Sequence, residues 1–175
     1  MHFFIVRVFI KQSEEIKKSR RDFFVWIVYK RKAVRASGGM MRLISENVVS
    51  VQDGMPVLFG GKSKGTGEIV FPYPEGAERE RYEKVKLKSE GALWSYTIQR
   101  FPPKNPPYLG PNTPDTFEPF AVGYIELPKE VIVETRIVSE DFSKLKVGQA
   151  MRLTTVPFAE DEQGTPLHTY AFEPI

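Results

Sequence analysis

Apolar and polar positions alternate with a period of two in several short segments of the chain. The segment 94–99, WSYTIQ, is the clearest example, and it predicts a half-buried strand. Further strands are predicted at 120–127, 131–137, 150–158 and 167–172. Residues 139–145 predict a short helical turn that Asp141 is placed to cap. We expect the strand that includes 94–99 to begin near Val85. The pattern then gives five strands, with a helical turn between the third and the fourth.

A long loop that contains seven prolines separates the strands at 94–99 and 120–127. The prolines forbid helix and remove most backbone donors that a sheet would use. Loops of this length in compact domains are usually functional or disordered. The aromatic residues Phe101, Tyr108 and Phe117, with Phe120 at the end of the loop, indicate that it packs against something. We expect a binding role, and a covering flap is the alternative.

Residues 43–84 predict glycine-turned hairpins. Gly61-Lys62-Ser63 has some likeness to a phosphate-binding loop, but the position of that motif's first glycine is Pro56. The motif also needs a following helix, and the run that follows, 69–72, is a strand that ends in proline. The charged run 78–81 is most simply a solvated face.

The amino-acid composition excludes several kinds of functional site. The 175 residues are enough for one domain with appendages and a real core, and the 41% hydrophobic content is that of a soluble globular protein. There is no cysteine, and His2 and His168 are the only histidines. Disulfides, cysteine nucleophiles, thiolate metal sites and histidine-rich metal sites are therefore excluded.

Charge is distributed unevenly. Residues 1–42 carry 11 Lys/Arg against 3 Asp/Glu, a net charge of +8, whereas residues 43–175 carry 14 against 19, a net charge of −5. We expect one of three roles for this basic N-terminal arm: an amphipathic segment on a membrane surface or partner, an element added to the core, or a translated stretch outside the natural protein that starts at Met40 or Met41. Neither apolar run in the arm is long enough to span a bilayer, and no secretory signal is evident, so the cytoplasm is the expected location.

The order of these segments resembles a known family, the zinc-ribbon plus OB-fold proteins that accompany acyl-CoA thiolases and were long catalogued as a domain of unknown function. The likeness covers residues 58–175 and is strongest at 93–108 and 118–128. It implies a mainly β chain in which zinc-ribbon-like (rubredoxin-like) hairpins precede a five-stranded OB-fold barrel. The expected divisions are 1–42 for the arm, 43–84 for the lead-in and hairpins and 85–175 for the OB fold. The strand count alone would fit any five-stranded antiparallel barrel or sandwich.

The chain departs from this family at the zinc ligands. The positions where family members carry two Cys-x-x-Cys pairs are Ser63, Thr66, Ala77 and Glu80. These side chains cannot form a tetrahedral structural zinc site. We therefore expect a degenerate, metal-free ribbon with no zinc and no covalently bound cofactor.

No catalytic constellation is evident in the sequence. His168 lies in a predicted strand, where a surface or satisfied histidine is expected in preference to a general base. The carboxylates form no recognisable pair, and Glu118 is expected to order the long loop. An independent hydrolase is a minor alternative.

The resemblance therefore implies a non-catalytic accessory subunit that binds acyl-CoA, docks on a thiolase-type enzyme, or does both. Cations, an aromatic platform and apolar walls are what an acyl-CoA ligand requires. The residues expected to bind ligand or partner are Trp94, Tyr96, Arg100, Phe101, Lys104, Tyr108, Phe117 and Phe120. For Trp94 the alternative is the barrel core, and for Arg100 and Lys104 it is simple solvation.

A single-stranded nucleic-acid module is the alternative function, because many OB folds bind such ligands by stacking bases on aromatic side chains. Trp94, Tyr96 and Phe101 could serve this purpose. The net negative charge of residues 43–175 argues against it, since phosphate neutralisation dominates nucleic-acid affinity.

Overall fold

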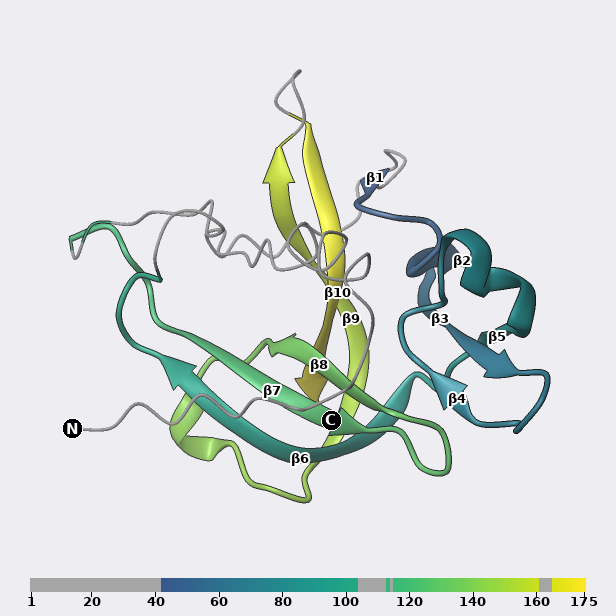
Figure 1. The fold of residues 1–175 in the computed structure, drawn as a ribbon. Coiled ribbons are helices and arrows are strands. Elements are labelled where there is room, and N and C mark those ends of the chain that lie inside the picture. The colour runs from purple at the N-terminus through teal and green to yellow at the C-terminus, as the bar shows by residue number, and fades with distance from the viewer. Residues whose placement is uncertain (1–41, 104–112, 114, 161–164) are drawn as a thin grey trace.

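The computed structural model describes residues 42–103, 113, 115–160 and 165–175 (Figure 1). Its elements are β1 (Arg42–Leu43), β2 (Val49–Gln52), β3 (Met55–Ser63), β4 (Ile69–Val70), η1 (Gly76–Arg81), β5 (Tyr82–Lys86), β6 (Glu90–Gln99), β7 (Phe120–Glu126), β8 (Ile132–Ile137), η2 (Phe142–Lys144), β9 (Ala150–Glu160) and β10 (Pro166–Pro174). The predicted mainly β fold is confirmed. The expectations for residues 1–41 and for the turn at 161–164 fall outside the described residues.

Strands β6 to β10 close into a barrel. β6, β7 and β8 form an antiparallel meander, β9 pairs with both β6 and β10, and β10 closes the barrel by running parallel to β8. This is the strand order of the OB fold, so the predicted barrel is confirmed and the sandwich alternative is excluded. The closing ladders are short, because β6 pairs with β9 over residues 90–92 and β8 pairs with β10 over residues 136–137.

The inside of the barrel is filled by the side chains that alternate inward along each strand. Among them, the large apolar side chains at most 4% exposed are Leu93, Ile125, Val133, Ile137, Met151, Leu153 and Phe172. Full burial of an aliphatic or aromatic side chain contributes about 1.5–3 kcal/mol. Gly123 leaves space for this packing, because a Cβ there would lie 2.6 Å from Ile137 Cδ1.

The helical turn predicted between the third and fourth barrel strands is η2. Its N-cap is Asp141, whose Oδ1 accepts a hydrogen bond of 2.9 Å from the Ser143 backbone N–H. Hydrogen bonds from the Ser143 hydroxyl and backbone lower the pKa of the Asp141 carboxyl. No helix in the described part of the chain has the length and apolarity required to cross a membrane.

Strands β2 to β5 form a second, smaller sheet, which we call the hairpin module (residues 49–86). β3 is its centre and pairs antiparallel with β2, β4 and β5. The prediction that the first barrel strand begins near Val85 was therefore wrong, because Val85 pairs with Gly60 in this sheet and the barrel begins at Glu90. The chain turns between the two strands, where the Lys88 N–H donates to Glu130 Oε2 at 2.8 Å and Lys88 Nζ donates to the Pro128 carbonyl at 2.7 Å.

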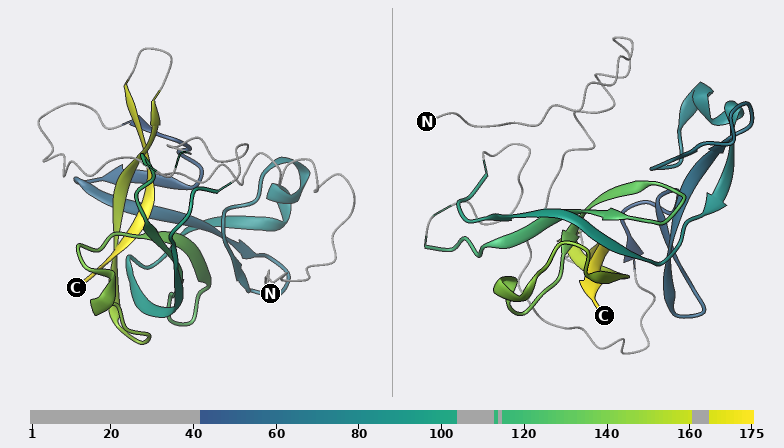
Figure 2. Two further views of the ribbon diagram at one scale, coloured as in Figure 1. Left: turned by 90° about the vertical axis from the view of Figure 1, so that its left-hand side faces the viewer. Right: turned by 90° about the horizontal axis from the view of Figure 1, so that it is seen from below.

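The hairpin module and the barrel share one hydrophobic core. Val49, Leu58 and Leu87 belong to the same buried cluster as the inward barrel residues. Phe71 of the module also contacts Tyr170 of β10 edge to face, with ring centroids 5.4 Å apart. The views in Figure 2 show the module lying beside the barrel, with β1 alongside β10.

Candidate docking face

The outer surface of β6, β7 and β8 is the candidate site. In OB folds the ligand surface is formed by the second and third strands and by the loop between the first two strands, which are here β7, β8 and the proline-rich loop. Because side chains alternate across a sheet, the neighbours of the inward residues point away from the core. We call the following set the outer face: Trp94, Val122, Tyr124, Ile132, Glu134 and Arg136.

Trp94 lies on this face because of a β-bulge. Leu93 is opposite Ile125 and Ser95 is opposite Tyr124, so Trp94 is the extra residue on β6. Its side chain is 55% exposed and contacts Tyr124 edge to face, with centroids 6.1 Å apart. Trp94 therefore does not belong to the barrel core, and much of its indole is accessible from outside.

Tyr124 and Glu134 form a directly opposed pair on β7 and β8. The Tyr124 hydroxyl donates a long hydrogen bond of 3.5 Å to Glu134 Oε2. Burial raises the pKa of the Glu134 carboxyl, although the hydrogen bond from Tyr124 lowers it in part. Burial also raises the pKa of Tyr124, and the nearby Glu134 charge raises it further. Within the described part of the chain, no cationic side chain forms a salt bridge with this carboxylate.

A small aromatic cluster fixes the end of the proline-rich loop against the same sheet. The Phe117 N–H donates to the Thr113 carbonyl at 3.0 Å, which forms a turn before β7. Phe117 contacts Phe120 with centroids 6.0 Å apart, and the Arg136 guanidinium lies 5.3 Å from the Phe120 ring centre. Phe120 is only 3% exposed, so this ring anchors the loop and does not itself present a binding surface.

The remaining predicted residues divide between interior and surface. Tyr96 is half-buried against the core, and its hydroxyl donates to the Leu145 carbonyl at 3.0 Å. Arg100 is exposed, and Phe101 is 77% exposed at the start of the loop. Lys104 and Tyr108 lie outside the described residues. Trp94 and the exposed start of the loop lie toward opposite ends of β6, about 20 Å apart along the extended strand, whereas Tyr96 and Phe120 are packing residues.

Sequence reasoning missed Tyr124, Glu134 and Arg136. The alternation along each strand contained the necessary information. Tyr124 points to the opposite face from the inward residues of β7, and Glu134 and Arg136 point to the opposite face from the inward residues of β8. This information could be recognised only after the register between the two strands was known. A strand that carries a tyrosine opposite a glutamate is common, and the bulge that brings Trp94 beside them has no sequence signature.

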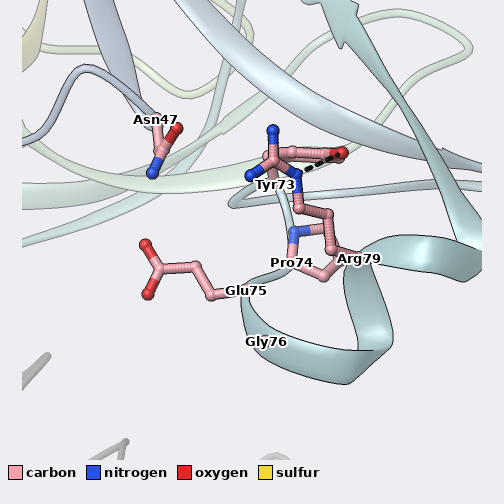
Figure 3. Close-up of a pocket in the computed structure, with 6 residues that line it drawn as sticks. All are labelled: Asn47, Tyr73, Pro74, Glu75, Gly76 and Arg79. Carbon is pink, nitrogen blue, oxygen red and sulfur yellow. Dashed lines mark hydrogen bonds between the residues drawn. The ribbon is translucent and has the colours of Figure 1, made fainter.

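The hairpin module carries a shallow hollow of about 230 Å³ on its surface. Figure 3 shows its lining residues: Asn47, Tyr73, Pro74, Glu75, Gly76 and Arg79. Arg79 Nε donates to the Tyr73 hydroxyl at 3.2 Å, and its guanidinium lies over the same ring. Arg79 and Tyr73 therefore satisfy one another, and the hollow is shallow, so it is a weaker candidate than the outer face.

The positions at which the resemblance places zinc ligands lie on two turns that hydrogen bonds hold together. The Lys64 N–H donates to the Arg81 carbonyl at 2.9 Å, and Lys64 Nζ donates to the Glu80 carbonyl at 2.9 Å. Ser63 Oγ accepts from the Thr66 N–H at 3.1 Å. Among the described residues, no group of three or more His, Asp or Glu side chains could hold a metal ion.

His168 lies in β10, beside β1 and β9. Its carbonyl accepts a hydrogen bond of 3.0 Å from the Ile44 N–H. The imidazole is half-buried, and Nδ1 is buried without a hydrogen-bond partner among the described residues. No carboxylate or nucleophile is paired with it there, so the geometry gives no support for a general base.

Comparison with known proteins finds a family model that is similar to part of the chain. Residues 84–156 match the family model described as ChsH2, C-terminal OB-fold domain. A comparison with curated proteins finds no match. Among solved structures, one described as an Ltp2–ChsH2 (DUF35) aldolase is 19% identical, with a TM-score of 0.49 over 67% of this chain and 84% of that chain. The resemblance predicted from the sequence is thus confirmed: residues 84–156 match the model of the ChsH2 C-terminal OB-fold domain, in a chain that contains no cysteine.

Proposed function

We propose that this chain is a non-catalytic accessory subunit that docks on a thiolase-type enzyme through the outer face and the adjoining proline-rich loop. The observation that carries the proposal is the pair formed by exposed Trp94 and half-buried Tyr124 on the outer face of a barrel that matches the ChsH2 C-terminal OB-fold model. Aromatic side chains of this kind are enriched at the centres of protein interfaces. They bury a large area and lose little conformational entropy.

The start of the loop offers a second exposed aromatic residue, beyond the end of β6 that pairs with Phe120. Pro102 and Pro103 follow the exposed Phe101, so the backbone there is already restricted before any partner binds. A stiff segment loses less entropy on docking than a flexible one. The accessible aromatic rings and the restricted loop together favour association with another protein over a merely structural role.

Acyl-CoA binding is the second part of the proposal. Trp94 and Phe101 offer exposed aromatic surface, and Arg100 offers an exposed cation for a phosphate group. Glu134 on the outer face argues against nucleic acid there, since a half-buried carboxylate repels a phosphate backbone.

The test of docking is a quantitative pull-down from the native cell with the full chain as bait. Mass spectrometry should find a thiolase-type enzyme enriched at a defined stoichiometry. Trp94→Ala should reduce the retained enzyme by about tenfold, the loss expected when a central aromatic contact is removed. Met55→Ala is the matched control, because Met55 is a 59% exposed apolar residue in the hairpin module. Equal retention by wild type and Trp94→Ala would contradict the proposed surface.

Acyl-CoA binding is tested separately by calorimetric titration with butyryl-CoA. Wild type should bind it more tightly than Arg100→Gln, which loses the cation, and Met55→Ala should behave as wild type. If the titration detects no binding to wild type, the proposed acyl-CoA binding is contradicted, and the proposed docking on an enzyme is unaffected. Tight, strongly salt-dependent binding of a single-stranded oligonucleotide would favour the nucleic-acid alternative.

A further inference from the structure

The Glu134 carboxylate is the least compensated charge that the structure shows on the outer face. It lies on a central barrel strand and is half-buried, and its only hydrogen bond from a described side chain is the 3.5 Å contact from Tyr124. A half-buried carboxylate normally requires a cation or several donors to offset the loss of hydration. Burial raises the pKa of the Glu134 carboxyl, as expected when that compensation is incomplete.

The surroundings of this carboxylate suit a planar cation. Tyr124 on β7 lies between Glu134 and Trp94: its hydroxyl contacts the carboxylate and its ring meets Trp94 edge to face. Ile132, 44% exposed, lies two residues before Glu134 on β8. A guanidinium is planar, is weakly hydrated, stacks on aromatic rings and can form two parallel hydrogen bonds with one carboxylate. An ammonium group satisfies these requirements less well because it is compact and strongly hydrated.

The protein already pairs guanidinium groups with aromatic rings elsewhere. Arg136 lies over Phe120 at 5.3 Å on the same face, and Arg79 lies over Tyr73 at 5.4 Å in the hairpin module. Arg136 is two residues from Glu134 along β8, a separation of about 7 Å between backbone positions. Its guanidinium lies over Phe120, and no other cationic side chain among the described residues forms a salt bridge with Glu134.

We propose that Trp94, Tyr124 and Glu134 form a receptor pocket for one arginine side chain of the partner protein. The guanidinium would lie against the two aromatic rings and donate to the Glu134 carboxylate. The inference deepens the proposed function, on which it rests for the identity of the partner. It adds how the outer face would recognise that partner, which is by binding an exposed arginine side chain of the partner.

The pocket is tested first with a small probe on the full chain. The probe is N-acetyl-arginine amide, and its control is the neutral isostere N-acetyl-citrulline amide. The chain has two tryptophans, so the indole N–H signal of Trp94 can be assigned in a nitrogen-15 correlation spectrum from a Trp26→Phe variant. The arginine probe should shift the Trp94 signal saturably. The citrulline probe, or the arginine probe with Glu134→Gln, should shift it at least about tenfold more weakly at equal concentration.

Glu126→Gln is the matched charge control, because Glu126 is an exposed carboxylate on β7 opposite Ile132. It should leave the response to the arginine probe unchanged. Equal shifts with arginine and citrulline, or a full response in Glu134→Gln, would overturn the pocket. A larger Trp94 shift with a single-stranded oligonucleotide than with the arginine probe would also overturn it.

The second measurement uses the thiolase-type enzyme retained in the pull-down. Glu134→Gln should weaken its affinity by about tenfold, and Glu126→Gln by less than about twofold. If the enzyme binds wild type and Glu134→Gln equally, the arginine pocket fails and the accessory function stands. If the arginine probe binds as expected but no such enzyme is retained, the pocket stands and the proposed function fails.

Discussion

The barrel and the hairpin module are both made of short, mostly antiparallel strands, but different forces hold them together. The barrel closes on itself and fills its interior with large apolar side chains such as Phe172 and Ile125, which are fully buried. The module is an open sheet whose strands contribute Val49 and Leu58 to the shared core. Much of its remaining cohesion comes from surface contacts, such as Lys84 Nζ over the Phe59 ring at 4.0 Å.

This difference indicates which of the two regions would gain stability from a structural metal site. An exposed cation–π contact contributes about 0.5–1 kcal/mol, far less than a structural zinc site. In this chain, which has no cysteine, we therefore expect the module to be the region of lower local stability. Close packing at Gly60 and Gly61 and the Lys64 hydrogen bonds are among its contacts. The barrel needs no such support, because closure and burial stabilise it directly.

Phe172→Ala should have the largest effect, because it empties the centre of the barrel. We expect the free energy of unfolding to fall by about 3–5 kcal/mol, measured by urea denaturation with far-ultraviolet circular dichroism. Phe101→Ala is the control, since the Phe101 ring is 77% exposed and its removal should change stability by less than about 0.5 kcal/mol. Similar small losses for both variants would show that the barrel core is not the main source of stability.

Gly61→Ala should destabilise the hairpin module and leave the barrel unaffected. A Cβ at this position would lie 2.6 Å from Pro74 Cδ and 3.2 Å from Tyr82 Cβ, so β3 would be pushed away from its neighbours. We expect a loss of about 1–3 kcal/mol that is confined to the module and is seen as faster amide exchange in β3 and β5 but not in β7. Gly65→Ala is the control, because a Cβ there meets nothing within 4 Å. Uniform loss of protection in both sheets would mean that module and barrel open together.

Lys64→Met should have a smaller effect of the same kind. It removes the 2.9 Å hydrogen bond to the Glu80 carbonyl but keeps the backbone hydrogen bond to Arg81. For an exposed interaction, we expect a loss of about 0.5–1 kcal/mol in the local stability of the module, measured by amide exchange. Lys62→Met, at an exposed position on the same strand, provides the comparison. If the two variants behave alike, the Lys64 ammonium does not hold the two turns together.

Glu134→Gln should have the smallest effect on stability, and one of opposite sign. Burial raises the pKa of Glu134 in the folded protein, so its ionised form reduces stability at neutral pH, and this cost disappears as the pH falls through the folded pKa towards the unfolded value. We expect the variant to be equal to or slightly more stable than wild type at pH 7, and the difference to shrink near pH 4. Thermal unfolding at several pH values checks this. A clear loss of stability at pH 7 would show that the carboxylate is already paired with a cation in the free protein.

The sequence predicted most of the barrel because alternation and turn signals act locally. The strands at 120–127, 131–137, 150–158 and 167–172 and the Asp141 cap all appear in the structure. The start of the barrel could not be predicted in the same way. Residues 82–86 alternate as a strand in either sheet, and only their pairing with β3 decides the matter.

The candidate site was predicted less completely. Trp94 was predicted to bind ligand or partner and is exposed on the outer face, and its role stays a prediction. Tyr96 packs against the barrel core, and Phe120 is buried beneath Phe117 and Arg136 on the outer side of the sheet. Aromatic character shows that a side chain will pack, and register decides on which face. The Tyr124–Glu134 pair depends on that register, which comes from closure of the whole barrel and not from any local pattern.

The central claim is that the outer face of a ChsH2-type OB barrel docks on a thiolase-type enzyme and performs no chemistry itself. The most direct test is the affinity of that enzyme, purified from the native cell, for immobilised wild type and for Trp94→Ala, with Met55→Ala as control. The account predicts saturable binding by wild type and by Met55→Ala and about tenfold weaker binding by Trp94→Ala. Equal affinity for all three proteins, or no binding by wild type, would contradict it.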